Sequence, residues 1–295
     1  MIARRSFLLG TTAIAGYGLL GAQAPARASG LSRTLAEDLS RIERESGGRL
    51  GVSIRDMLLE QTPIGHRADE RFPMCSTFKL LAAAAVLKRV EAGQERLDRR
   101  IAFEAKDIVV NSAITKDRTG GTGMTLEELC DAAMTYSDNT AGNLLLESLG
   151  GPQALTAYAR SLGDTVTRLD RIEPDLNDAV PGDPRDTTTP AAMLKNLQAL
   201  MLGDALSPAS RERLTTWLVD NKTGNARLRA GLPKSWRVGD KTGAGEYGTN
   251  NDVAIVWPPE RAPILIAIYL TETSAAAEKR NATLAAVGRA VASSF

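Results

Sequence analysis

The chain has 295 residues, enough for one large domain or two closely packed ones. Its 36 basic and 35 acidic residues give a formal net charge of +1, which argues against a basic surface for nucleic acid. The chain has a single histidine, His66, which excludes a metal site built from several histidines. His66 is also the one residue that could serve as the histidine of a Ser-His-Asp triad. His66 lies in a polar turn, and we expect it to be a solvated loop residue. The composition indicates a soluble globular protein, and we expect neither a metal nor a cofactor.

The first 28 residues have the features of an export signal. Arg4 and Arg5 precede an uncharged run over 6–26, and Ala26-Arg27-Ala28 fits a cleavage site. The alternative is a membrane anchor, but several glycines dilute the hydrophobicity of the run. We therefore predict a twin-arginine signal peptide over 1–28 and a periplasmic or secreted protein without a membrane anchor after processing.

Periodicity and capping signals predict the elements in chain order. A charged helix over 32–46 is followed by a strand over 49–57 and an alanine-rich helix over 78–90. Thr125 and Glu128 form a capping box that begins another helix. Further helices are expected at 140–149, 152–162, 189–202, 208–219 and 275–293, and strands at 236–242, 252–257 and 264–271.

Strands near both ends of the chain, with only helices between them, indicate an α+β fold. We expect an antiparallel sheet flanked by the N- and C-terminal helices, with an inserted all-helical domain. The sheet domain is placed at 29–72 and 221–295, and the helical domain at 73–220.

Ser76 and Lys79 lie one helical turn apart at the start of the alanine-rich helix. A helix N-terminus supplies backbone N–H groups for an oxyanion, and a lysine of lowered pKa can replace histidine as the base. Taken alone, the spacing is a weak signal, because about 0.5 matches are expected by chance in a chain of this composition, and a plain surface pair is the default interpretation.

Ser137-Asp138-Asn139 falls at a break between two predicted helices. The Ser137 hydroxyl is suited to relaying a proton to a leaving nitrogen, and the Asn139 amide to holding a substrate carbonyl. The alternative is an ordinary helix N-cap, which all three residue types favour.

Lys241-Thr242-Gly243 ends the predicted strand over 236–242. The glycine permits close approach of a substrate, and the lysine and threonine are suited to a carboxylate. A second copy of the motif, Lys222-Thr223-Gly224, lies in a polar loop without a strand to hold it, so we assign the functional role to Lys241.

Glu173 and Asn177 open a segment that lacks any period. Such a stretch inside a compact domain is usually functional, and the two side chains are suited to positioning a water for attack. A plain surface loop is the alternative.

The order of the four motifs resembles the pattern of class A β-lactamases across the predicted mature chain. The resemblance implies that Ser76 is the acylated nucleophile and that Lys79 belongs to its activating network. Ser137 would carry a proton to the β-lactam nitrogen, and Glu173 with Asn177 would hold the deacylating water. Whether Lys79 or Glu173 takes the serine proton stays open.

The same resemblance implies the substrate contacts. Backbone N–H groups of Ser76 and Ala244 would form the oxyanion hole, and Asn139 would hold the substrate. Lys241, Thr242 and Gly243 would complete the binding edge. Arg171 and Asp186 match the family's ion pair at the Glu173 loop, and the Glu173–Pro174 bond would be cis.

The chain departs from parts of the family at the substrate rim. Asn250 and Asn281 stand where some members have an arginine, and Arg227 matches a third arrangement for binding the substrate carboxylate. Asn111 replaces an aromatic residue at the entrance.

The resemblance implies a different disulfide partner for each of the two cysteines, and neither partner position holds a cysteine in this chain. We therefore expect Cys75 and Cys130 to be free thiols.

The expected activity is hydrolysis of small-molecule β-lactams by a monomer, with no nucleic acid as partner. Two alternatives are a penicillin-binding DD-peptidase or transpeptidase and a silent penicillin-binding sensor domain. Neither gives a reason for Glu173 together with Asn177.

Overall fold

The computed structural model of the protein describes residues 23–59 and 62–295. Arg4 and Arg5, on which the predicted export signal depends, lie outside these residues. Within the described part, no helix is long and apolar enough to span a bilayer.

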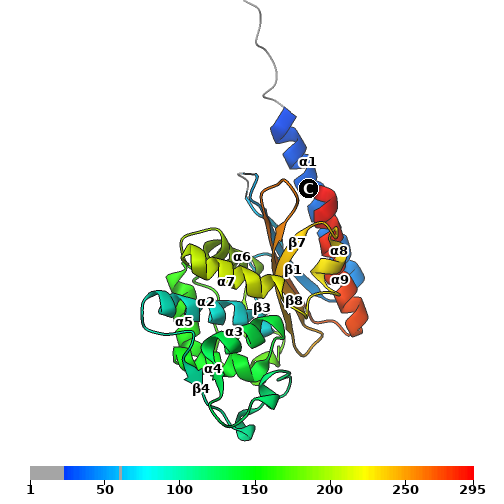
Figure 1. Cartoon of the computed structure of the whole chain (residues 1–295). Helices are drawn as coiled ribbons and strands as arrows, with labels where there is room; N and C mark the ends of the chain where they lie inside the picture. The colour runs from blue at the N-terminus through cyan, green and yellow to red at the C-terminus, as the bar shows by residue number, and fades with distance from the viewer. Residues whose placement is uncertain (1–22, 60–61) are drawn as a thin grey trace, which may run out of the picture.

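A five-stranded antiparallel sheet forms one half of the molecule (Figure 1). Its strand order is β2-β1-β9-β8-β7, with bounds Ile64–His66, Arg49–Asp56, Ile264–Thr271, Asn250–Trp257 and Arg237–Ala244. The register pairs Val52 with Ile268 and Thr242 with Asp252. Strand β7 is therefore an edge strand, and its outer side is open to the helical half. The predicted α+β class with an antiparallel sheet is confirmed.

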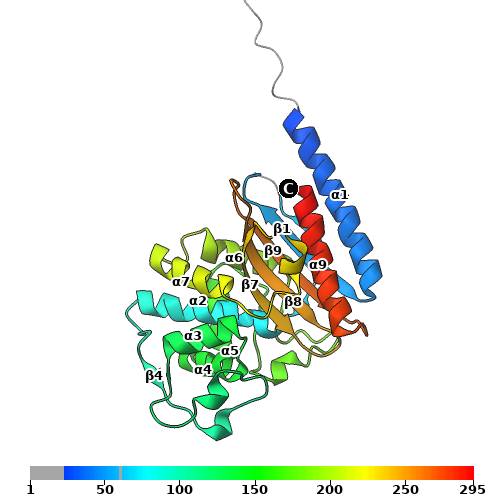
Figure 2. The ribbon, with the colours of Figure 1, turned by 45° about the vertical axis from the view of Figure 1, so that its right-hand side comes forward.

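Helices α1 (Gln23–Ser46) and α9 (Ala277–Ser294) lie side by side on one face of the sheet (Figures 1 and 2). Alternation along the strands supplies a core on each face. In β9, Ile266 and Ile268 join the core under α1 and α9, whereas Ala267 and Tyr269 join the core of the other half. The sheet is thus buried on both sides.

The other half is helical. It contains α2 (Phe78–Glu91), α3 (Leu126–Thr135), α4 (Asn139–Leu149), α5 (Pro152–Ser161), α6 (Pro190–Met201) and α7 (Pro208–Val219). Every residue of α2 from Phe78 to Leu87 is buried, and its four successive alanines let α3, α4, α5 and α7 pack around it. Helix α2 is therefore the central element of this half, and its N-terminal end points at β7.

Short elements complete the fold. The pairs are β3 (Phe72–Pro73) with β6 (Thr187–Thr188) and β4 (Arg100–Ile101) with β5 (Met124–Thr125). Helix α8 (Leu228–Gly231) packs on α9, and the 3₁₀ turns are η1 (Cys75–Thr77), η2 (Ala105–Asp107), η3 (Thr115–Asp117) and η4 (Asp175–Asn177).

The local sequence signals agree well with the structure. The capping box is present: Thr125 Oγ1 accepts from Glu128 N at 3.1 Å, and Thr125 N donates to Glu128 Oε2 at 2.7 Å. The prediction for His66 is wrong. It lies in the strand β2, which no periodic pattern in the sequence predicts. Its Nε2 is 2.9 Å from Glu43 Oε2, and its side chain is 17% exposed.

Replacement of Gly231 by alanine tests the packing of α8. A Cβ at this position would lie 1.9 Å from the backbone oxygen of Ala285, so α8 and α9 must move apart. Overpacking of this kind costs about 1–3 kcal/mol, and the midpoint of urea unfolding should fall accordingly. The exposed neighbour Ala230, changed to serine, is the control and should unfold as the parent does. Equal midpoints for both variants would contradict the close contact.

Candidate active site

A cleft of about 400 Å³ lies where η1 and α2 meet β7. It brings together residues from separate predicted motifs: Ser76, Ser137, Asn139, Asn177, Arg227, Thr242, Gly243 and Ala244. Lys79, Glu173 and Lys241 lie behind this lining, with exposures of 0%, 1% and 0%. The structure therefore places all the predicted site residues in one region.

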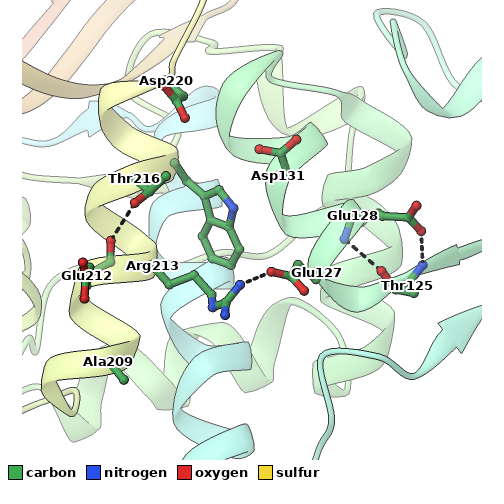
Figure 3. Close-up of a pocket in the computed structure, with 10 residues that line it drawn as sticks. Thr125, Glu127, Glu128, Asp131, Ala209, Glu212, Arg213, Thr216 and Asp220 are labelled. Atoms are coloured by element: carbon green, nitrogen blue, oxygen red, sulfur yellow. Dashed lines mark hydrogen bonds and ion pairs between the residues drawn. The ribbon is translucent and has the colours of Figure 1, made fainter.

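A larger cavity, of about 770 Å³, lies between α3 and α7 (Figure 3). Its carboxylates belong to Glu127, Glu128, Asp131, Glu212 and Asp220. Figure 3 shows Arg213 bonded to Glu127, and no lysine lines the cavity. Volume alone would select this cavity, but the predicted site residues gather at the smaller cleft.

Ser76 is held in the turn η1, which runs directly into α2. Cys75 before it has φ of +46°, a left-handed conformation that a non-glycine residue adopts at a cost. Asn251 of β8 offsets this cost, because its Nδ2 donates to the carbonyls of Pro73 (2.9 Å) and Met74 (3.1 Å). Strand β8 thus fixes the turn that presents Ser76 to the cleft.

Lys79 has a wholly buried ammonium group. Its Nζ donates to Asn139 Oδ1 (2.7 Å), to the Ser137 carbonyl (2.8 Å) and to Ser76 Oγ (2.9 Å). Glu173 Oε1 is 3.0 Å away. Burial lowers the pKa of Lys79 from its ordinary value, and the negative charge of Glu173 opposes this shift.

The Ser137-Asp138-Asn139 segment supplies both a helix cap and two residues of the cleft. Asp138 is the N-cap of α4, with Oδ1 accepting from Ala141 N at 2.9 Å. Ser137, at φ of +58°, and Asn139 line the cleft on either side of the cap. The alternatives of cap and site are therefore compatible, because different side chains carry them.

Glu173 is anchored through both carboxylate oxygens. Oε1 accepts from Ser76 Oγ at 3.0 Å, and Oε2 accepts from Asn177 Nδ2. The Glu173–Pro174 peptide is cis, as expected. Arg171 Nε and Asp186 Oδ2 are 2.6 Å apart and close the ends of the loop, so the implied ion pair is present.

Asn143, in α4, is a site residue that the sequence analysis missed. Its Nδ2 donates to the Glu173 carbonyl and its Oδ1 accepts from the Glu173 backbone N–H, both at 2.8 Å. An isolated asparagine in a helix gives no signal by itself. Its position one turn after Asn139 is the only hint, because residues four apart share a helix face.

Lys241 projects from β7 beside Ser137. Its Nζ donates to Ser137 Oγ (3.0 Å) and to the Thr242 carbonyl (2.9 Å). Burial holds the pKa of Lys241 well below its ordinary value, and the positive charges of Lys79 and Arg227 act in the same direction. The cleft thus has two buried lysines on the two sides of Ser137.

Gly243 allows β7 to approach the nucleophile turn. A Cβ at this position would lie 2.8 Å from the Met74 carbonyl oxygen, closer than real side chains approach. Ala244 follows at the exposed end of the strand. The last residues of β7 therefore form the wall of the cleft opposite Ser76.

Arg227 precedes α8, and its Nη1 donates to the carbonyls of Gly243 (2.7 Å) and Asn251 (2.8 Å). Burial lowers the pKa of Arg227, opposed by the charge of Asp252. At the rim, Asn250 Nδ2 donates to Asn281 Oδ1 at 3.1 Å, so the two asparagines pair with each other.

Both cysteines are free, as expected, and the structure shows both to be fully buried. Burial raises the pKa of each thiol, above all by desolvation. Position 245 lies next to Cys75, because a Cβ on Gly245 would be 2.7 Å from its Sγ. A cysteine at position 245 would be close enough to pair with Cys75, but the residue there is glycine.

Comparison with known proteins gives one consistent result. A sequence model described as "Beta-lactamase enzyme family" matches residues 34–295. Beta-lactamase Toho-1 of Escherichia coli is 49% identical over 292 residues, covering 99% of this chain and 98% of the relative. Beta-lactamase CTX-M-97 of the same species is 51% identical over 264 residues, 90% of each protein. An ancestral (GNCA) class A beta-lactamase structure has a TM-score of 0.87 at 62% identity, covering 88% of this chain and 100% of that one.

The chain therefore belongs to the β-lactamase enzyme family. Within it, the chain is a class A enzyme, which hydrolyses the amide bond of β-lactam antibiotics and confers resistance to them. The peptidase and sensor alternatives are not favoured.

Replacement of Asn143 tests the attachment of the Glu173 loop. Asn143→Ala removes a donor and an acceptor from the buried Glu173 backbone, and each unsatisfied group costs about 1–3 kcal/mol. Thermal unfolding should begin at lower temperature, and limited proteolysis should cut within 171–186. Asn143→Asp keeps the acceptor but sets a carboxylate oxygen against the Glu173 carbonyl, so it should not recover the parent stability. Parent-like stability and protease resistance of the alanine variant would contradict the role.

Proposed function

We propose that Ser76 attacks the β-lactam carbonyl to form an acyl-enzyme, which a water held by Glu173 and Asn177 then hydrolyses. One observation carries the proposal: Ser76 Oγ lies 2.9 Å from Lys79 Nζ and 3.0 Å from Glu173 Oε1. A hydroxyl between an ammonium and a carboxylate has both a proton acceptor and a stabilising cation within reach.

The hydrogen-bond directions suggest the path of the Ser76 proton. A protonated lysine has three donors and no acceptor, and Lys79 has the oxygens of Asn139, Ser137, Ser76 and Glu173 within 3.0 Å. Ser76 Oγ in turn donates to Glu173 Oε1 at 3.0 Å. In this resting arrangement, Glu173 is the group placed to receive the proton.

Ser137 is suited to protonating the leaving nitrogen. Lys241 Nζ donates to Ser137 Oγ, so the serine accepts there and its own O–H proton is free to face the ring nitrogen. The depressed pKa of Lys241 does not change this direction while the ammonium is protonated.

Asn177 supports the placement of a water. Its Nδ2 donates to Glu173 Oε2, whereas its buried Oδ1 accepts no hydrogen bond from the described residues. A buried acceptor without a partner is costly, and a water bonded to Glu173 and Asn177 would satisfy it. Such a water would lie beside the carbonyl carbon of an acylated Ser76.

The remaining lining residues would bind the substrate. The N–H groups of Ser76 and Ala244 would receive the oxyanion. Asn139 Nδ2 donates to the Val110 carbonyl, and its second N–H is available for the substrate. Lys241, Thr242 and Arg227 would bind the carboxylate along Gly243.

Replacement of Glu173 by alanine should slow deacylation far more than acylation, because a general base is worth about 10²–10⁴-fold. A stoichiometric burst of ring opening should precede near-zero turnover, and mass spectrometry should find the intact adduct on Ser76.

Asp175→Ala is the matched control, an exposed carboxylate two residues away in the same loop. It should turn over without accumulating an adduct. Full turnover by a folded Glu173→Ala enzyme would remove Glu173 from the mechanism. An adduct on any residue other than Ser76 would remove Ser76 as nucleophile.

We also propose that the enzyme acts as a periplasmic or secreted monomer exported through the twin-arginine route, on the basis of Arg4, Arg5 and the uncharged run after them. Arg4→Lys with Arg5→Lys should abolish activity in the periplasmic fraction and retain it in whole-cell lysate. The same double change at Arg96 and Arg99, which the structure places on the surface, is the control. Unchanged periplasmic activity in the first variant would refute the route.

A further inference from the structure

The second Lys-Thr-Gly motif, which the sequence analysis set aside, reaches the cleft through its threonine. Thr223 lines the cleft, and its Oγ1 is 2.5 Å from Oγ1 of Thr242. We infer that Thr223 is a positioning residue, whose hydroxyl sets whether Thr242 offers a donor or an acceptor to the substrate. This inference rests on the proposed binding of the substrate carboxylate by Thr242.

The first step is the orientation of Asn221, which lies between β7 and Thr223. Its Oδ1 accepts from the backbone N–H of Thr223 at 3.0 Å, a donor whose direction is fixed by the chain. Its Nδ2 donates to the carboxylate Oδ1 of Asp240 at 3.0 Å. Both contacts agree, so the oxygen of the amide faces Thr223.

The second step follows from counting hydroxyl protons. Thr223 Oγ1 donates its one proton to Asn221 Oδ1 at 2.8 Å, so it can only accept from Thr242. Thr242 must then donate its own proton to Thr223. In this state Thr242 presents only lone pairs to the cleft, which suits a donor on a ligand and opposes a carboxylate.

The third step is a second state that the same atoms permit. If both hydroxyls rotate, Thr223 donates to Thr242 and Thr242 donates to a carboxylate in the cleft. Asn221 Oδ1 keeps the backbone N–H of Thr223, so it is not left without a partner. No covalent bond changes, and the number of protons is the same in both states. The chain of hydroxyls polarises in one direction, which strengthens the terminal bond to the carboxylate.

The hydrogen-bonded chain Asn221–Thr223–Thr242, which we call the relay, is fixed at its Asn221 end. Asp240 is wholly buried and also accepts from Arg229 Nη2 at 2.6 Å and Nε at 2.8 Å. Asn221 is therefore held by a carboxylate that is itself anchored. The two hydroxyls are the only mobile members, and they switch together.

The relay makes a specific prediction for binding. In the open cleft, water can replace Thr223 as the partner of Thr242, so the free enzyme loses little when Thr223 becomes valine. With substrate bound, water is excluded from the cleft, so the valine variant has nothing to replace the hydrogen bond that Thr223 donates to Thr242 in the parent enzyme. Thr223→Val should therefore raise KM for nitrocefin by about 2- to 10-fold, the factor that one neutral hydrogen bond carries. Its kcat should stay within about twofold, and Thr223→Ser should restore the parent KM.

The experiment compares nitrocefin with its methyl ester, which lacks the free carboxylate, in Thr223→Val, Thr242→Val and the double variant. We expect Thr223→Val to leave the KM of the ester unchanged and to have no further effect once Thr242 is valine. Turnover of the ester also reports that each variant is folded.

Three results would overturn the inference. An equal change for ester and acid would show that Thr223 acts on the fold of the cleft. An additive double variant would show that it does not act through Thr242. If Thr242→Val itself left the KM of nitrocefin unchanged, the carboxylate site of the proposed function would fail together with the relay, whereas an effect of Thr242→Val without one of Thr223→Val would refute the relay alone.

Discussion

The constraint on which the site depends is the burial of the Lys79 ammonium. An isolated charge in a protein interior costs several kcal/mol, so it must be surrounded by acceptors. Its acceptors come from three separate parts of the chain: the turn before α2, the Ser137-Asp138-Asn139 segment and the Glu173 loop. Satisfying one charge therefore draws together the segments that form the cleft.

The second buried lysine imposes a related constraint on β7. Lys241 and Lys79 repel each other, and the repulsion adds to desolvation in lowering the pKa of Lys241. Ser137 lies between them, accepting from Lys241 at its hydroxyl and from Lys79 at its carbonyl. Ser137 presents both oxygens from a left-handed backbone conformation, which costs free energy in a non-glycine residue.

Local signals made much of the fold predictable. The alanine-rich run predicted α2, the Thr125 capping box predicted α3, and runs between Gly-, Asn- and Pro-rich turns predicted the three C-terminal strands. These features depend on residues a few positions apart, so a linear pattern contains them. The β2 strand was not predictable in this way, because its three residues depend on pairing with β1.

The motif residues were predictable because four chemical patterns occurred in one order, although each alone was ambiguous. Their supporting residues were not. Asn143 meets Glu173 across 30 positions, and Asn251 meets the Pro73 carbonyl across 178. Thr223 was set aside because its loop lacked a strand, yet the neighbouring strand β7 holds it through Thr242. Contacts of this kind follow from the tertiary fold rather than from local sequence.

The rim of the cleft has asparagines at positions 250 and 281, where the family resemblance led us to expect an arginine in some members. The two asparagines are neutral and are joined by one hydrogen bond, so neither position supplies a positive charge. Arg227 and Lys241 are cations near the cleft end of β7, and Arg227 already uses Nη1 on two backbone carbonyls. Because the guanidinium is planar, the hydrogen bonds of Nη1 also fix the directions in which the other N–H groups of Arg227 point. In the proposed binding mode, recognition of the substrate carboxylate then depends on the direction of hydrogen bonds from Arg227 and the Thr223–Thr242 pair as much as on the amount of charge.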